Sequence, residues 1–216
     1  MSKKHPIISV TGSSGAGTTT VKTTFDQIFR REGFKSVSIE GDAFHRFDRA
    51  AMKDELTKRK AAGDQTFSHF SYEANELGKL EEVFRTYAET GCGETRHYVH
   101  DDAEAAKYGS APGTFTDWAP FAEGSDVLFY EGLHGAVKNS EVNLSALADL
   151  KIGVVPVINL EWIQKIHRDK AQRGYSTEAV TDVILRRMHA YVHCITPQFT
   201  ETDINFQRVP VVDTSN

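Results

Sequence analysis

Several features are scarce in this 216-residue sequence, and each shortage excludes a class of protein. There are only two cysteines, Cys92 and Cys194, which are too few and too far apart for a disulfide framework or a CxxC zinc site. Buried thiols are the commoner explanation for such cysteines. No apolar run approaches the ~20 residues that cross a bilayer. The first six residues also lack the apolar region of a signal peptide.

Positive charge is not in excess either. Thirty acidic residues against 25 basic ones give a net charge of −5, so we expect no nucleic-acid partner and no membrane partner. Basic residues near a site would then serve a small anionic substrate. These shortages together predict a protein of a reducing, cytoplasmic compartment.

What the sequence does contain is an alternation of strand and helix patterns. Apolar residues make up 39% and charged residues 25%, which is typical of a globular protein, and the length suits a single domain over residues 1–216. The expected strands are 6–11, 35–40, 127–130, 152–160 and 209–212. The expected helices are 18–31, 43–62, 73–90, 161–172 and 177–193. This order predicts an α/β fold with a mostly parallel sheet that helices cover on both faces.

A glycine-rich loop joins the first strand to the first helix. It consists of Gly12, Ser13, Ser14, Gly15, Ala16, Gly17, Thr18, Thr19 and Thr20. Glycines let successive backbone N–H groups converge on phosphate oxygens, and the helix N-terminus adds a favourable dipole. The loop fits a P-loop for ATP, with the Thr19 hydroxyl placed to coordinate Mg²⁺. The pattern GxxxxGK[ST] has lysine where this chain has Thr18, so a plain structural turn stays an alternative for the loop alone.

A carboxylate and two basic side chains follow the second strand. Asp42 comes at its carboxyl end, on the side of the sheet where the glycine loop lies, and could accept a proton from an attacking hydroxyl. If Asp42 caps the next helix, then His45 and Arg49 share its face. Such a face would suit an acceptor that carries its own phosphate, because arginine binds phosphate bidentately. The alternative is that Asp42 is only a helix cap and Arg49 a solvated charge.

Two further segments complete the expected site. Glu131 ends the apolar strand 127–130 and is placed to hold Mg²⁺. The segment 165–174 concentrates positive charge, and Lys165 and Arg168 share one face of a helix there. Such a segment could close over the phosphates and supply the cation that Thr18 lacks, although a salt-bridged surface helix is the ordinary reading of a charge run.

The spacing His97-x-x-His100 suggests zinc, but no second cluster completes a coordination shell. Tyr98 and His100 fit the acceptor pocket better.

With these residues assembled, the chain resembles the phosphoribulokinases, in the bacterial form found in purple-bacterial autotrophs. The resemblance spans essentially the whole chain. It rests on SVTGSSGAGTTTVK, SIEGDAFHRF, FSHFSYEANEL, YVHDDAEA, FYEGLHGA, LKIGVVPVINLEWIQKIHRDK and RRMHAYVHCITPQF. It implies a P-loop kinase with a three-layer fold, which transfers the γ-phosphate of MgATP to O1 of ribulose 5-phosphate in the Calvin cycle.

The resemblance also implies roles for single residues. Asp42 would be the catalytic base, and Lys165 and Arg168 would stabilise transition-state charge. Mg²⁺ would be held by Glu131, Asp169 and Thr19. The sugar phosphate would be bound by His45, Arg49, Tyr98, His100 and Arg173. The bacterial form similarly lacks the loop lysine.

Regulation and assembly are implied as well. The bacterial form responds to NADH as activator and AMP as inhibitor, and it is a homo-oligomer, typically an octamer. Arg31 and Arg187 are the candidates for the effector site. Ala16 stands where plant-type enzymes carry a regulatory cysteine, which excludes thiol switching at that position. Family members normally continue past PVVDTSN, so we expect the 216 residues to be a fragment truncated at the C-terminus.

Two alternatives remain open. A uridine-kinase-like enzyme shares the loop, the acid after the second strand and an RDxxxRG segment, but a nucleoside offers no phosphate for His45 and Arg49. A non-catalytic nucleotide-sensing subunit would have no need of Asp42 and Glu131.

Overall fold

The computed structural model describes residues 4–210, apart from the side chains of residues 172 and 173. Its strands are β1 Ile7–Thr11, β2 Ser36–Glu40, β3 Glu94–Thr95, β4 Ala119–Pro120, β5 Val127–Gly132, β6 Leu150–Pro156 and β7 Ile204–Arg208. Its α-helices are α1 Thr18–Glu32, α2 Arg49–Ala61, α3 Leu77–Thr90, α4 Asp102–Tyr108, α5 Ile158–Arg173 and α6 Thr177–Ala190. Short helical turns are η1 Gly41–Phe44, η2 Tyr72–Ala74, η3 Leu144–Ala146, the π-helical η4 Tyr191–Ile195, and η5 Thr196–Thr200.

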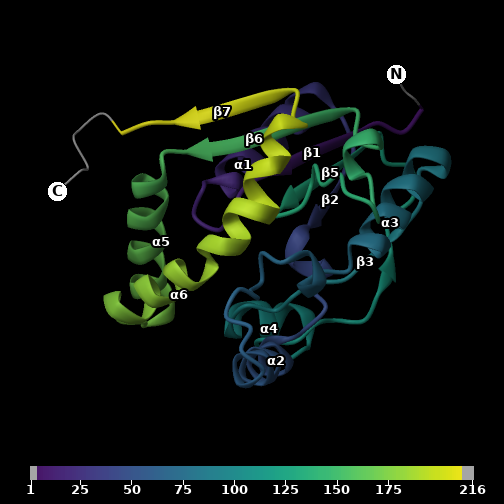
Figure 1. The fold of residues 1–216 in the computed structure, drawn as a ribbon. Helices are drawn as coiled ribbons and strands as arrows, with labels where there is room; N and C mark the ends of the chain where they lie inside the picture. The colour runs from purple at the N-terminus through teal and green to yellow at the C-terminus, as the bar shows by residue number, and fades with distance from the viewer. Residues whose placement is uncertain (1–3, 211–216) are drawn as a thin grey trace.

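Five strands form one parallel sheet in the order β2-β5-β1-β6-β7, and β3 pairs with β4 in a separate antiparallel ribbon. β1 lies in the middle of the sheet, where Ile7 pairs with Leu128 of β5 and Ile8 with Leu150 of β6. All five strands end on the side where α5 begins (Figure 1). Ligands of open parallel sheets bind outside these carboxyl ends.

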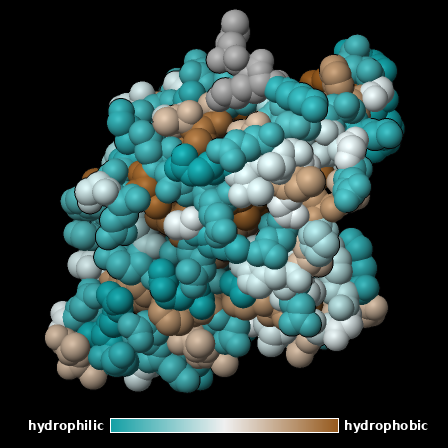
Figure 2. Space-filling model, turned by 90° about the vertical axis from the view of Figure 1, so that its right-hand side faces the viewer, coloured by the Kyte–Doolittle hydropathy of each residue, from teal (hydrophilic) through white to brown (hydrophobic). Residues whose placement is uncertain are grey.

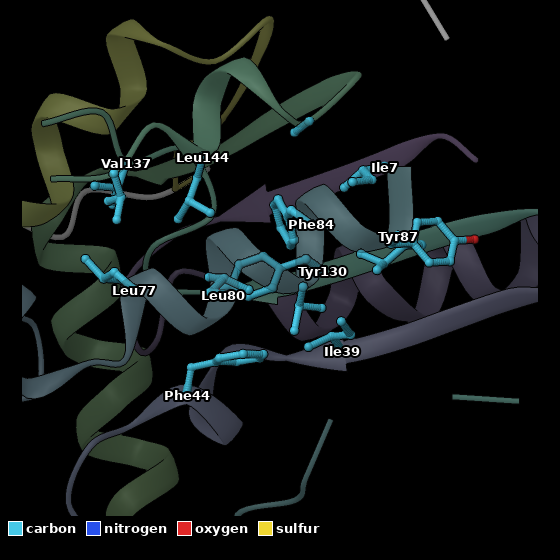
Figure 3. Packing of buried hydrophobic residues seen from close by; sticks show 14 of the residues in the cluster. Ile7, Ile39, Phe44, Leu77, Leu80, Phe84, Tyr87, Tyr130, Val137 and Leu144 are labelled. Atoms are coloured by element: carbon cyan, nitrogen blue, oxygen red, sulfur yellow. The ribbon is translucent and has the colours of Figure 1, made fainter. Parts of the chain in front are cut away.

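Alternate residues of the strands face two separate cores, as expected for a sheet that is covered on both sides. On one face Ile7, Ile39 and Tyr130 pack with Leu80 and Phe84 of α3 (Figure 3). On the other face, α1 covers a second cluster with its apolar side chains. That cluster includes Val10, Val127, Phe129, Ile152 and Val154 from the strands and Val21, Phe25 and Phe29 from α1. The predicted three-layer architecture is confirmed.

Several predicted boundaries were wrong. The helix expected at 43–62 begins at Arg49, because residues 41–44 form η1 and Asp48 caps α2 by accepting a hydrogen bond from Ala51 N at 2.8 Å. The strand expected over 152–160 starts at Leu150 and stops at Pro156, and α5 begins two residues later.

The start of one helix and the position of the last strand were also predicted wrongly. The helix expected from residue 73 begins at Leu77, after the turn η2. The last strand is Ile204–Arg208 and not 209–212. Residues 209 and 210 follow that strand, and 211 and 212 lie outside the described residues.

On the face shown in Figure 2, hydrophilic surface surrounds scattered hydrophobic patches. Within residues 4–210 no helix has both the length and the apolar character needed to span a membrane.

Candidate active site

The glycine loop leaves the carboxyl end of β1 and leads into α1. Gly12 N donates to Gly132 O at 3.1 Å, which ties the start of the loop to the end of β5. Gly15 and Gly17 have φ of 107° and 100°, a backbone conformation that favours glycine. Gly17 caps α1, so the unpaired N–H groups of the first helical turn point out of the loop. Such a turn is a ready-made phosphate site.

Thr18, in the position of the usual lysine, is turned toward Glu131. Burial raises the pKa of Glu131, and the hydrogen bond from Thr18 counteracts part of that rise. A nearby cation would relieve the cost of burying this carboxylate. Thr19, by contrast, is exposed at the loop. The residues therefore offer oxygen donors of the kind that Mg²⁺ prefers.

The predicted basic segment lies on α5 and packs against the loop. A Cβ at Gly15 would lie 3.1 Å from Glu161 O of α5, so the two backbones are in close contact. Arg168 donates from Nη2 to Ser14 Oγ at 3.0 Å. Lys165 Nζ lies 2.6 Å from Asp169 Oδ2, and Arg168 Nη2 lies 2.9 Å from Asp169 Oδ1. Burial, helped by the charge of Arg187, lowers the pKa of Lys165 to about 8.

Asp42 lies in η1, directly after β2, with 40% of its side chain exposed. Its Oδ1 is 3.2 Å from His45 Nε2, and its Oδ2 is 3.4 Å from His100 Nε2. Partial burial works against ionisation of Asp42. The charge and hydrogen bond of His45, with the charge of His100, outweigh it and hold the pKa below its ordinary value. Asp42 is thus a partly exposed, ionised carboxylate.

The expected common helix face of Asp42, His45 and Arg49 is wrong, because η1 and α2 are separate elements. The three residues still meet, through the loop that carries His100. Arg49 Nη2 donates to His100 O at 2.9 Å, and Arg49 also bonds the Tyr98 hydroxyl. The rings of Tyr98 and His100 are 4.9 Å apart. The side chain of Arg173, the fifth expected acceptor ligand, lies outside the described residues.

The two effector candidates lie far apart. Arg31 is exposed and pairs with Glu32 at 2.9 Å in the last turn of α1, about 20 Å along that helix from the glycine loop. Arg187 on α6 lies over the ring of Phe70, 5.2 Å from its centroid, and lines a small cavity with Ser14, Glu161 and Lys165. Arg187 is therefore close to the glycine loop and Arg31 is not.

Sequence reasoning missed four polar residues around the site, of which three are buried and His69 is half-buried. Glu161 accepts a hydrogen bond from Ser13 of the loop, and burial raises its pKa. His69 lies 5.3 Å from the ring of His45, between centroids. Asn75 and His134 form a buried pair behind His45, with Asn75 Nδ2 3.1 Å from His134 Nε2. None carries a spacing signal, since the partners named here are 24 to 148 residues away in sequence.

Comparisons with known proteins agree with this geometry. Residues 7–215 match the model of the Phosphoribulokinase / Uridine kinase family. The chain is 82% identical to phosphoribulokinase 1 of Cereibacter sphaeroides and 67% identical to the phosphoribulokinase of Nitrobacter vulgaris, in each case over the whole chain and 74% of the relative. A solved phosphoribulokinase from Rhodobacter spheroides superposes with a TM-score of 0.88 at 77% identity, over 100% of this chain and 74% of that one.

A more distant structure shows the fold alone. A possible uridine kinase from Bacillus stearothermophilus superposes with a TM-score of 0.59 at 16% identity, over 95% of this chain and 90% of that one. The matches at high identity over the whole of this chain and the family model agree with the parallel sheet and its glycine loop. The chain therefore belongs to the phosphoribulokinase / uridine kinase family of ATP-dependent kinases.

Proposed function

We propose that the chain is a phosphoribulokinase, which transfers the γ-phosphate of MgATP to O1 of ribulose 5-phosphate and yields ribulose 1,5-bisphosphate for the Calvin cycle. The observation that carries the proposal is the place of Asp42. An ionised, partly exposed carboxylate stands at the end of β2, on the same edge of the sheet as the glycine loop, and two histidines contact it.

In the proposed reaction Asp42 is the general base. It takes the proton of the O1 hydroxyl as the oxygen attacks the γ-phosphorus, while the bond from that phosphorus to the β,γ-bridging oxygen breaks and ADP leaves. A low pKa keeps Asp42 ionised at neutral pH and so ready to accept this proton. His45, Arg49, Tyr98, His100 and Arg173 are proposed to bind the sugar phosphate.

The ATP half of the proposed site is the loop Gly12–Thr20 together with α5. Backbone N–H groups of the loop bind the phosphates, and Arg168, already bonded to Ser14, supplies the charge that Thr18 lacks. Lys165 adds a second positive charge at the same helix face. Their role is to neutralise charge on the transferring phosphoryl group.

Mg²⁺ would be held by Glu131, with Thr19 and Asp169 as further candidates, and would neutralise charge on the phosphates when bound. Both Asp169 oxygens already face cations, at 2.6 Å and 2.9 Å, so Glu131 fits the role better. No group of three or more His, Cys, Asp or Glu side chains with metal-ligand geometry occurs in the described part of the chain. Mg²⁺ usually needs only one or two carboxylates, because waters and substrate phosphates complete its shell.

A uridine-kinase-like activity is the second candidate, favoured by the shared family model. The basic side chains of His45 and Arg49 argue against this activity, since an uncharged nucleoside offers no anionic group for them to bind.

The test is ATP turnover with ribulose 5-phosphate and with uridine in parallel. We expect turnover with the sugar phosphate and a bisphosphate whose new group is on O1, as located by ³¹P–¹³C coupling. Turnover with uridine alone would refute the proposal.

Regulation and assembly form a further part of the proposal. By resemblance to the bacterial phosphoribulokinases, NADH activates the enzyme, AMP inhibits it, and the protein assembles as an octamer, with Arg31 and Arg187 as the candidate residues for effector binding. Assays with and without each nucleotide test the first two points, and light scattering tests the third.

A further inference from the structure

Asn75 lies directly behind His45, inside the protein. Its side chain is only 4% exposed, and its Oδ1 is 2.8 Å from His45 Nδ1. The two residues also pair through an isolated antiparallel bridge. Flanking bonds, Glu76 N to Phe44 O at 2.7 Å and Arg46 N to Ala74 O at 2.9 Å, fix the segment against the turn that carries Asp42. The amide of Asn75 is therefore held at a set position relative to the imidazole.

The orientation of that amide is also fixed. Nδ2 of Asn75 donates to Ser71 O at 2.8 Å and to His69 O at 3.0 Å. Backbone carbonyls only accept hydrogen bonds, so the amide nitrogen must face them and the amide oxygen must face His45. An oxygen at this place requires a hydrogen on Nδ1 of His45.

The second ring nitrogen meets an acceptor as well. Nε2 of His45 is 3.2 Å from Asp42 Oδ1, and an ionised carboxylate only accepts. Both ring nitrogens of His45 thus face acceptors, which is the environment of an imidazolium with two N–H donors.

The groups around His45 shift its pKa in opposite directions. Burial and the charge of Arg187 lower its pKa, while Asp42 and the Asn75 hydrogen bond raise it, and the raising effects prevail. Tyr98 and His69 border the ring, with centroids 6.2 Å and 5.3 Å away. His69 and His134 add no competing charge at neutral pH, because burial lowers the pKa of each to about 3.

We propose that Asn75 is a positioning residue, which keeps His45 doubly protonated so that the proposed acceptor site presents a fixed positive charge beside Asp42 to the anionic group of the acceptor. The identity of the acceptor in this inference rests on the proposed function. The claim that Asn75 keeps His45 doubly protonated does not. Asn75 itself touches no substrate. It acts through His45 by supplying the acceptor for Nδ1.

The direct test is ¹⁵N NMR of the histidine ring nitrogens in the full chain, with the His45 signals assigned by their loss in His45→Gln. We expect both His45 nitrogens to be protonated at about pH 7. In Asn75→Leu, which removes the acceptor, we expect one His45 nitrogen to lose its proton. Asn75→Asp keeps an acceptor facing Nδ1 and should preserve the imidazolium.

Kinetics supply the second readout. We expect Asn75→Leu to raise KM for ribulose 5-phosphate about 10-fold, the effect of a weakened hydrogen bond to a charged group, with KM for ATP unchanged. Asn143→Leu is the matched control, because the Asn143 side chain also bonds the backbone, but as the N-cap of η3, where it accepts from Ala146 N at 3.2 Å.

A singly protonated His45 in the wild-type protein would overturn the inference, and so would an unchanged His45 spectrum in Asn75→Leu. If Asn75→Leu does not fold, the wild-type and Asn75→Asp spectra still decide the protonation state. If the protein does not phosphorylate ribulose 5-phosphate, the proposed function fails, while the spectra continue to test Asn75 by themselves.

Discussion

Arg168 on α5 donates a hydrogen bond from Nη2 to Ser14 Oγ of the glycine loop, with the two atoms 3.0 Å apart. These residues are 154 positions apart in sequence. The contact brings a guanidinium to a loop whose usual lysine is replaced by Thr18. A positive charge on a neighbouring helix can thus take the place of one inside the loop.

The contact leads to a first prediction. Arg168→Ala should lower kcat by roughly 10²- to 10³-fold, as the loss of one preorganised donor to transition-state charge does, with a smaller effect on KM for ATP. Lys170→Ala is the control, since Lys170 is exposed on the same helix and bonds Thr177 Oγ1 of α6 at 3.0 Å. An equal loss in both variants would show that α5 acts through its overall charge.

The second prediction concerns the acceptor side. Arg49→Ala should raise KM for ribulose 5-phosphate far more than KM for ATP, because Arg49 lies beside Tyr98 and His100 and away from the glycine loop. Steady-state kinetics with each substrate varied in turn measure the two constants. Lys60→Ala, at an exposed position of the same helix, should change neither. If both constants rise equally in Arg49→Ala, Arg49 does not belong to the acceptor site.

The third prediction is a loss of stability in acid that comes from buried histidines. The pKa of His134 is lowered to about 3 by burial, so its stabilising effect is present above about pH 6.5, its value in the unfolded chain, and is lost as the pH falls toward 3. At pH 5 the loss amounts to about 2 kcal/mol of the free energy of unfolding, from 1.36 kcal/mol per pH unit.

Denaturant unfolding at pH 7.5 and pH 5 measures this loss. His134→Gln should be less stable than the wild type at neutral pH, but it should lose less stability on acidification. A parallel pH dependence in the two proteins would mean that His134 is protonated in the folded state.

The sequence predicted the parts of this molecule that depend on local patterns. The strand before Gly12 and the helix after Thr18 were expected from β-branched residues followed by a 3.6-residue period, and β1 and α1 confirm them. Asp42 and Glu131 were placed correctly because Asp42 follows β2 and Glu131 lies near the end of β5, and the carboxyl ends of these parallel strands lie at one edge. β2 and β5 are hydrogen-bonded neighbours, with Glu40 opposite Glu131.

The features that could not be predicted from the sequence depend on contacts between residues that are distant in the chain. Residues 41–44 form a 3₁₀ turn because Asp48, and not Asp42, provides the side-chain cap of α2, and either aspartate suits a cap by its type. Asn75, His134 and Glu161 are buried polar residues without a periodic pattern. Only the folded chain brings Asn75 to His45 and Glu161 to Ser13.

The place of Asp42 is the central claim, and turnover by Asp42→Asn tests it most directly. The substitution keeps the shape of the side chain and removes the proton acceptor. Asp182→Asn, at an exposed carboxylate that pairs with Arg186 on α6, controls for loss of charge. With ATP and ribulose 5-phosphate both saturating, we predict that kcat of Asp42→Asn falls by roughly 10²- to 10⁴-fold, while Asp182→Asn keeps the wild-type rate. A kcat for Asp42→Asn within a few-fold of wild type would contradict the account.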